Sequence, residues 1–119
     1  MSAPLHRLRG VRPLTGVDDP AAADPRRAYG AAGELLKALS APLRIEVIML
    51  LTEQGPLCVH ELVDTLAVAQ PLVSQHLRVL RSAGVVVAER RGREVAYSLA
   101  DEHIGRIVAD AVAHVQEVR

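Results

Sequence analysis

Aromatic residues are almost absent from this chain of 119 residues, which has no Trp, no Phe and only Tyr29 and Tyr97. A hydrophobic core must therefore be built from Leu, Val, Ile and Ala. Half of the residues are nonetheless apolar, so we expect a globular chain rather than a disordered one. At this length it forms one domain, and dimerisation would help so small a core by burying a further apolar face.

Cysteine is nearly absent as well. Cys58 is the only one, which excludes an intrachain disulfide and fits a reducing compartment. The first residues contain no apolar run typical of a signal peptide, and no segment approaches the length of a membrane span. We therefore expect a cytoplasmic protein that has no membrane partner.

An excess of charge is also missing, because 14 basic residues balance 14 acidic ones. The net charge therefore does not indicate a nucleic-acid partner. The distribution of charge does, since five arginines lie between Arg78 and Arg93 against the single acid Glu89. This local excess favours contact with phosphates.

Hydrophobic periodicity divides the chain into a tail and a folded domain. Residues 1–25 hold four of the seven prolines without any periodicity, which predicts a flexible N-terminal tail. Residues 26–119 form the predicted folded domain. Within it, apolar spacing predicts helices over 26–39, 42–53, 59–66 and 70–83.

Proline and glycine mark the ends of these helices. Pro42 and Pro71 suit first turns, Gly55-Pro56 stops the second helix, and Gly84 is expected to end the fourth in a left-handed cap. The fourth helix should bury Leu72, Val73, Leu77 and Leu80. Because only Ala67–Ala69 separates the third and fourth helices, the pair is predicted to be a helix-turn-helix.

Two strand-like runs follow, 85–88 and 95–99. The six residues between them, Glu89 to Glu94, form a basic tip that contains Gly92, so we predict a β-hairpin. A terminal helix over 101–119 completes the chain. The expected fold class is mainly α with a small β-hairpin: a winged helix-turn-helix with four helices, a hairpin and a terminal helix, assembled as a homodimer.

Polar residues on the fourth helix fall away from its apolar side. Gln70, Ser74 and Gln75 are candidates for contacts with base edges in the major groove. Arg78, Arg90, Arg91 and Arg93 suit the phosphate backbone and, from the hairpin, the minor groove. Each residue alone could simply be solvated, but the tight turn and the basic hairpin together favour double-stranded DNA as the partner.

The terminal helix carries four potential metal ligands: Asp101, His103, His114 and Glu117. His103 and His114 are roughly 16 Å apart along the axis, too far for one ion with bonds of about 2 Å. His114 and Glu117 are neighbours on one helical face, and Asp101 lies beside His103 at the helix entrance. Each chain therefore offers two half-sites. The simpler reading is a solvated helix whose Asp101 is only an N-cap.

An antiparallel pair of terminal helices would complete both sites. Facing residues in such a pair have a constant sum of residue numbers. The pairings of His103 with His114 and of Asp101 with Glu117 give nearly the same sum. A homodimer centred near Val108 and Ala109 would thus form two sites, each with Asp101 and His103 from one chain and His114 and Glu117 from the other. Two-fold symmetry is the commonest arrangement of soluble oligomers.

From Glu34 to Glu117 the chain resembles the ArsR/SmtB family of metal-sensing winged-helix repressors. The segments that carry the likeness are ALSAPLRIEVIMLL (38–51), LCVHEL (57–62), QPLVSQHLRVLRSAGVV (70–86), RRGREVAYSL (90–99) and the four ligands of the terminal helix. The resemblance implies a homodimer that represses transcription from operator DNA when metal-free and releases the DNA when it binds metal.

The chain also departs from the family. Ala41 and Ala69 stand where many relatives begin helices with Asp or Ser, so these caps are expected to be about 1 kcal/mol weaker. Some members have a second metal site between the third helix and the partner's N-terminal arm. Cys58 and Glu61 match its helix part, but the arm has no cysteine and only His6.

Two imidazoles and two carboxylates suit tetrahedral Zn(II), with Co(II) as a mimic. We therefore expect Zn(II) as an allosteric effector. The alternative is a repressor of the same family that senses another signal. That signal would be oxidation of Cys58, or a different metal ion, Co(II) or Ni(II). A zinc hydrolase would need an open coordination position, and four protein ligands leave none. The chain is thus expected to be no enzyme and to have no small-molecule substrate. A purely architectural DNA-binding protein would show no metal effect.

Overall fold

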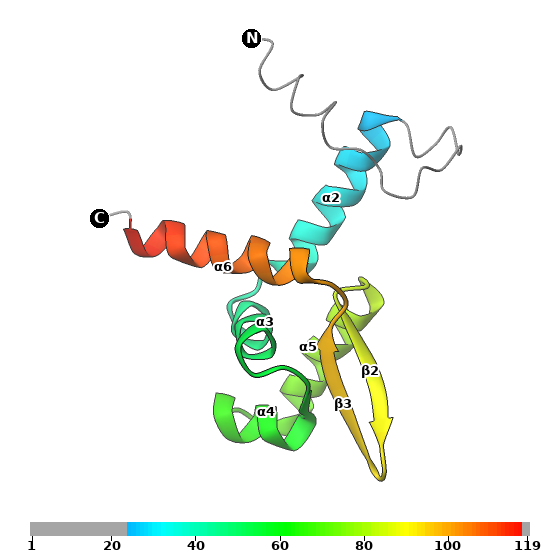
Figure 1. The fold of residues 1–119 in the computed structure, drawn as a ribbon, viewed down its shortest axis with the longest axis vertical. Coiled ribbons are helices and arrows are strands. Elements are labelled where there is room, and N and C mark those ends of the chain that lie inside the picture. The colour runs from blue at the N-terminus through cyan, green and yellow to red at the C-terminus, as the bar shows by residue number, and fades with distance from the viewer. Residues whose placement is uncertain (1–23, 118–119) are drawn as a thin grey trace. The chain divides into compact units, whose positions relative to one another are not determined.

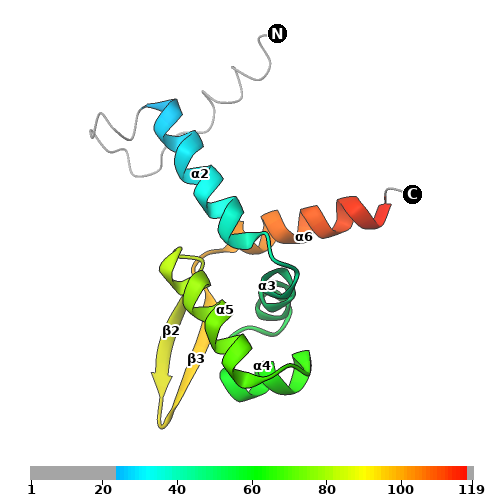
Figure 2. The same ribbon diagram turned by 180° about the vertical axis from the view of Figure 1, so that it is seen from behind.

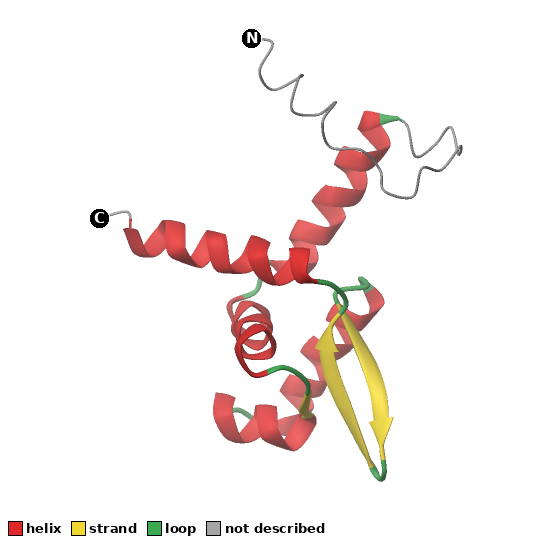
Figure 3. Cartoon of the chain, viewed as in Figure 1, coloured by secondary structure: helices red, strands yellow, loops and turns green. Residues whose placement is uncertain are grey.

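The computed structural model describes residues 24–117, which form a mainly helical chain with one small sheet (Figures 1 and 3). The elements in order are α2 (Pro25–Leu39), α3 (Pro42–Gln54), β1 (Leu57–Cys58), α4 (Val59–Leu66), α5 (Gln70–Ser82), β2 (Val86–Arg91), β3 (Glu94–Leu99) and α6 (Glu102–Glu117). The predicted winged helix-turn-helix is confirmed. No helix in the described range is both long and apolar enough to cross a membrane.

The compact unit that carries the fold is Glu34–Arg119, and the first turns of α2 up to Gly33 belong to a separate unit. The predicted tail falls almost entirely on residues 1–23, which lie outside the described residues, as do Val118 and Arg119. The predicted boundary at residue 25 therefore stays a prediction.

Helix ends follow the expected local chemistry. α3 and α5 each begin with a proline in the first turn, and their N-caps Ala41 and Ala69 make no side-chain capping hydrogen bond. Gly84 has φ of +75°, as predicted for a left-handed ending of α5. The next amide, that of Val85, donates to the carbonyl of Leu80 at 2.9 Å, which closes the end of the helix.

The hairpin is longer, and its tip shorter, than predicted. β2 and β3 pair antiparallel from Val86 opposite Leu99 to Arg91 opposite Glu94. The prediction of a six-residue tip was wrong, because only Gly92 and Arg93 connect the strands. Gly92 has φ of +64°, a conformation that two-residue hairpin turns require and that glycine adopts without strain.

A third strand was not predicted. β1 pairs antiparallel with β3, with Leu57 opposite Tyr97 and Cys58 opposite Ala96, so the sheet order is β1-β3-β2. Since β1 leads directly into α4, the sheet ties the hairpin to the helix-turn-helix. Figure 2, which views the molecule from behind, shows α5 beside the hairpin.

The core is aliphatic, as the composition requires. Its most deeply buried side chains come from α3, α4, α5 and the start of β2: Val47, Ile48, Leu62, Val73, Leu77, Leu80, Val85 and Val86. The prediction that Leu72 is buried was wrong, because 40% of it is exposed. Leu72 lies about 100° round the helix from Val73, at the edge of the face that the core covers.

α6 is buried over its first half only. Ile104, Gly105 and Val108 are buried, whereas Val115 is 66% exposed. At Gly105 the helix approaches α3 closely, because a Cβ there would lie 2.8 Å from Oγ1 of Thr52. The Thr52 hydroxyl itself donates to the carbonyl of Ile48 at 2.7 Å.

Candidate DNA-binding surface and metal-ligand pairs

The helix-turn-helix consists of α4, a short turn and α5. Ala67 ends α4 in the left-handed region, with φ 58° and ψ 41°, which costs a residue with a Cβ roughly 1 kcal/mol. The turn is therefore held by the packing of both helices, which bury Leu62 and Leu66 from α4 and Val73 and Leu77 from α5.

The predicted DNA-reading residues lie on the accessible sides of α5. Gln70, Gln75 and Arg78 are exposed and Ser74 is half-buried. Gln75 and Arg78 lie opposite the face that Val73 buries, since helical geometry turns each by well over 90° from it. These side chains are free to meet a ligand, and their contact with DNA stays a prediction.

His76 on the same helix has a defined partner within the chain. Its Nδ1 accepts a hydrogen bond from Nε of Arg44 at 3.0 Å. This hydrogen bond joins α5 to the adjoining helix α3.

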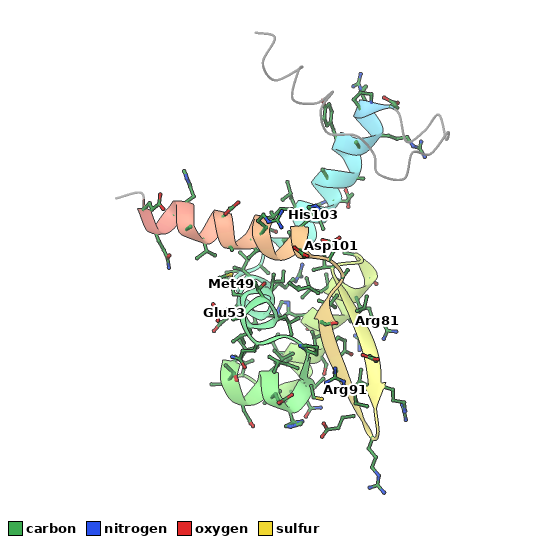
Figure 4. The ribbon with its side chains drawn as sticks, in the orientation of Figure 1. Met49, Glu53, Arg81, Arg91, Asp101 and His103 are labelled. Atoms are coloured by element: carbon green, nitrogen blue, oxygen red, sulfur yellow. The ribbon has the colours of Figure 1, made fainter. Side chains whose placement is uncertain are left out.

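The three arginines predicted on the hairpin are all exposed. Arg90 and Arg91 belong to β2, whereas Arg93 lies in the turn; Figure 4 shows Arg91 near the end of the hairpin. Because successive strand residues point to opposite faces, Arg90 and Arg91 cannot both face the same partner surface. The predicted tip held all three arginines, whereas the observed two-residue turn holds only Arg93 and leaves Arg90 and Arg91 in the strand.

The first pair of predicted metal ligands lies together where α6 begins (Figure 4). Nδ1 of His103 is 3.6 Å from Oδ1 of Asp101, and both side chains are more than half exposed. Oδ1 of Asp101 also accepts a hydrogen bond from the amide of Ile104 at 3.2 Å. Asp101 is therefore an N-cap, as expected.

The second pair, His114 and Glu117, is exposed at the far end of the same helix. Over residues 24–117, no three His, Cys, Asp or Glu side chains come close enough together to hold a metal ion. The four predicted ligands thus do not come together within the described chain, and the pairing of His114 with Glu117 stays a prediction.

Cys58 and Glu61, predicted for a second metal site, are engaged with their own surroundings. Oε1 of Glu61 accepts a hydrogen bond from the Cys58 amide at 2.8 Å, which caps α4. A hydrogen bond to Glu94 and burial raise the pKa of the Cys58 thiol. Glu94 also lies 3.6 Å from Nδ1 of His60. His6 lies outside the described residues, so the second site stays a prediction.

Sequence reasoning missed an apolar groove on the compact unit. It has a volume of about 170 Å³ and lies between the end of α2, the start of α3 and the middle of α6. The side chains that line it are Leu36, Leu39, Ser40, Ile45, Ile107, Val108 and Ala111. Leu36 and Ile107 remain 53% and 39% exposed. The sequence feature that could have predicted the groove is the position of Leu36 and Ile107 on the apolar faces of two helices.

Comparison with known proteins agrees with this architecture. Residues 41–87 match the family described as bacterial regulatory protein, arsR family. The chain is 61% identical over 93 residues to the HTH-type transcriptional repressor SmtB of Mycobacterium tuberculosis, covering 78% of this chain and 68% of that relative. It is 34% identical over 85 residues to the cadmium resistance transcriptional regulatory protein CadC homolog of Staphylococcus aureus, covering 71% and 70%.

The fold is shared with a solved relative. The solution structure of apo-NmtR has a TM-score of 0.69 and 35% identity, and the match covers 87% of each chain. Relatives with these names are regulators of transcription rather than enzymes, as the sequence predicts for this chain. The chain belongs to the ArsR family and is an SmtB-like, helix-turn-helix transcriptional repressor that binds operator DNA.

Proposed function

We propose that the chain is a zinc-responsive repressor that acts in the cytoplasm. Its metal-free homodimer binds operator DNA, and Zn(II) bound between the terminal helices of the two subunits releases it. The observation that carries the proposal is the pair of exposed half-sites, Asp101 with His103 and His114 with Glu117, at opposite ends of α6.

The face of α6 between these half-sites supports an antiparallel dimer. His103, Ile107, Asp110, His114 and Glu117 follow one another at alternating spacings of four and three residues, which places them on one helical face. All five are exposed. Val108, near the centre expected from the sequence, is instead 3% exposed and packs within its own chain. Ile107, which is 39% exposed on this face, is therefore the better candidate for the apolar contact beside the dimer centre.

The apolar groove extends this face towards α2. Leu36 and Ile107 leave much of their surface in solvent, and a second copy of the chain would cover both. Burial of apolar surface contributes about 25 cal/mol per Å². The occupant that we propose is α6 of the partner, because Ile107, Ala111 and Val115 of that helix are apolar and exposed, and because the half-sites need a second helix.

The donor set fits Zn(II). Each half-site offers one imidazole and one carboxylate, and the side chains are exposed rather than tied into the core. Two nitrogen and two oxygen donors make a closed tetrahedral set, which is typical of structural and regulatory zinc. Bound zinc would supply an electrostatic link between the two subunits. The name of the CadC homolog, which refers to cadmium resistance, further supports a metal effector in this family.

A change at α6 has a short route to the DNA-reading elements. α6 follows β3 with only Ala100 and Asp101 between them, and it contacts α3 where Gly105 meets Thr52. A shift of α6 in the dimer would therefore move the hairpin and the spacing of the two α5 helices, which must match successive major grooves.

Oxidation sensing through Cys58 is the alternative that this environment disfavours. The carboxylate of Glu94 and burial raise the pKa of the thiol, so less of it is thiolate at neutral pH. Because the thiolate is the reactive form, Cys58 is a poor candidate for a redox sensor.

A zinc titration of the full chain on duplex DNA from its own promoter tests the proposal. By fluorescence anisotropy, zinc should weaken binding by about tenfold or more, within the usual range of allosteric coupling. His114→Ala should bind DNA normally and ignore zinc. His60→Ala, which removes another exposed histidine, should respond like the wild type.

Two results would contradict the proposal. A normal zinc response of His114→Ala would exclude the terminal helix as the sensor. Release of DNA by Ni(II) but not by Zn(II) would show that nickel, and not zinc, is the effector. The coordination geometry can be followed with Co(II) bound in place of zinc.

A further inference from the structure

Arg44 is a cation that joins three helices through one side chain. It lies in the first turn of α3, is partly buried, and donates from Nε to Nδ1 of His76 in α5 at 3.0 Å. Its Nη1 donates to the carbonyl of Ala38, in the last turn of α2, at 2.9 Å. Both partners belong to the compact unit.

Both contacts suit a guanidinium and not a smaller cation. The last carbonyls of a helix have no partner within the helix, and a positive charge there is favoured by the helix dipole. A guanidinium holds several N–H donors in a rigid plane, so one group can satisfy two acceptors in different directions. A lysine ammonium would have to reach both acceptors from a single nitrogen atom, whereas Arg44 uses two.

The contact also fixes the state of His76. Arg44 is always protonated and has no acceptor, so Nδ1 of His76 must carry a lone pair. The imidazole is therefore neutral, with its proton on Nε2. Among the described side-chain contacts of α5 with α3, this hydrogen bond fixes a direction, whereas the buried Val73, Leu77 and Leu80 make non-directional apolar contacts.

The neighbour of His76 explains why direction matters. Gln75 is exposed and lies about 100° further round the helix. Base recognition needs hydrogen bonds of good geometry, whereas phosphate contacts tolerate small rotations better because charge attraction is less directional. A helix free to roll about its axis would thus lose discrimination before it lost affinity for DNA in general.

We propose that Arg44 is a positioning residue for DNA recognition, which clamps His76 and thereby sets the rotation of α5 against α2 and α3. Arg44 does not touch the DNA itself. The proposal rests on α5 being the DNA-reading helix, which is part of the proposed function.

The test compares two duplexes, the chain's own promoter and a scrambled sequence of the same length, with zinc-free full-length protein. Arg44→Gln and His76→Leu should each weaken promoter binding by about tenfold, the effect of a charge-assisted hydrogen bond. Binding to the scrambled duplex should change by less than about twofold, because phosphate contacts dominate there.

Two further variants separate positioning from simple packing. His76→Asn keeps an acceptor near the position of Nδ1 and should recover most of the promoter affinity. The double variant Arg44→Gln, His76→Leu should be no weaker than either single variant, because both remove the same interaction. Arg106→Gln is the matched control, since within residues 24–117 its guanidinium pairs with Glu102 on the surface of α6 at 3.4 Å.

Imidazole nitrogen NMR of the wild-type protein gives a readout that does not depend on folding of the variants. His76 should appear as the neutral form protonated on Nε2. Another tautomer in the wild type, or promoter affinity of Arg44→Gln within twofold of the wild type, would overturn the proposal. If Arg44→Gln fails to fold, the contrast between His76→Leu and His76→Asn decides it.

Gln75→Ala distinguishes failure of this inference from failure of the proposed function. If Gln75→Ala also leaves promoter affinity unchanged, α5 is not the reading helix and the premise fails. If Gln75→Ala weakens promoter binding and Arg44→Gln does not, only the clamp is wrong.

Discussion

α5 and α6 are both amphipathic helices, yet the chain buries most of the apolar face of α5 and only part of that of α6. The apolar face of α5 is covered from Val73 to Leu80 by other elements of the same chain. α6 is fully buried only between Ile104 and Val108, whereas Val115 in its second half is 66% exposed, and Figure 1 shows that half extending past α3. The reading helix is thus fixed within one subunit, whereas the terminal helix still lacks a partner.

The difference separates two properties that mutations can disturb independently. Changes at the buried face of α5 should act on folding. Changes at the open face of α6 should act on assembly and on whatever depends on it. Three substitutions in α5 and α6 test this division and a fourth tests the N-cap of α3, with expected effects that fall from the first to the last.

Leu77→Ala should lower the free energy of unfolding by about 3 kcal/mol, the usual cost of a cavity at a buried leucine. Leu77 is 1% exposed at the centre of the core. Urea denaturation followed by circular dichroism measures the loss. A cost below 1 kcal/mol would mean that α5 is not held by its own chain.

Ile107→Asp should leave the fold intact and weaken self-association by about a hundredfold, the effect of a charge at an interface hot spot. Sedimentation equilibrium measures the association. The control is Val87→Asp, at an apolar residue on β2 that is 48% exposed and should not affect assembly. Equal dimer stability of both variants would remove α6 from the interface.

Gly105→Ala tests the border between the two halves of α6. The added methyl group would lie 2.8 Å from Oγ1 of Thr52 and 3.1 Å from Cδ1 of Leu99, so the fold should lose about 1–2 kcal/mol despite the better helix propensity of alanine. Combining it with Thr52→Ala should recover part of the loss. Thermal denaturation measures these changes in stability. In that experiment the control Gly33→Ala, where a Cβ meets nothing within 4 Å, should be neutral or stabilising.

Ala41→Ser should stabilise the fold by up to about 1 kcal/mol, because a serine at this N-cap can accept a hydrogen bond from the first turn of α3. Ala41 has the extended backbone of an N-cap, with φ −98° and ψ 136°, but no capping side chain. The gain is measured as a higher midpoint of thermal unfolding. A lower midpoint would show that the small side chain is needed there.

Much of the fold could be predicted because local chemistry determines where its elements begin and end. Pro42, Pro71 and Gly84 each mark a helix end that the structure contains. β1 could not be predicted in this way. A strand of two residues has no periodicity of its own, and its existence depends on β3, whose residues lie almost forty positions later in the sequence.

The candidate site shows the same contrast between features set by local sequence and features set by long-range contacts. The spacing of Asp101 and His103, and the N-cap at Asp101, follow from the start of one helix. The contact between Arg44 and His76 depends on how α3 and α5 rotate against each other, which no spacing within either helix encodes. The closure of the two half-sites depends on a second chain, and its geometry stays a prediction.

The short strand β1 has a consequence for protein engineering. Because Leu57 and Cys58 pair with β3, the helix-turn-helix and the hairpin share one hydrogen-bonded ladder and do not form separable modules. A chimera built to change operator choice should therefore exchange the whole segment from Leu57 to Leu99. A graft of α4 and α5 alone would leave behind both β1 and the strand β3 with which it pairs.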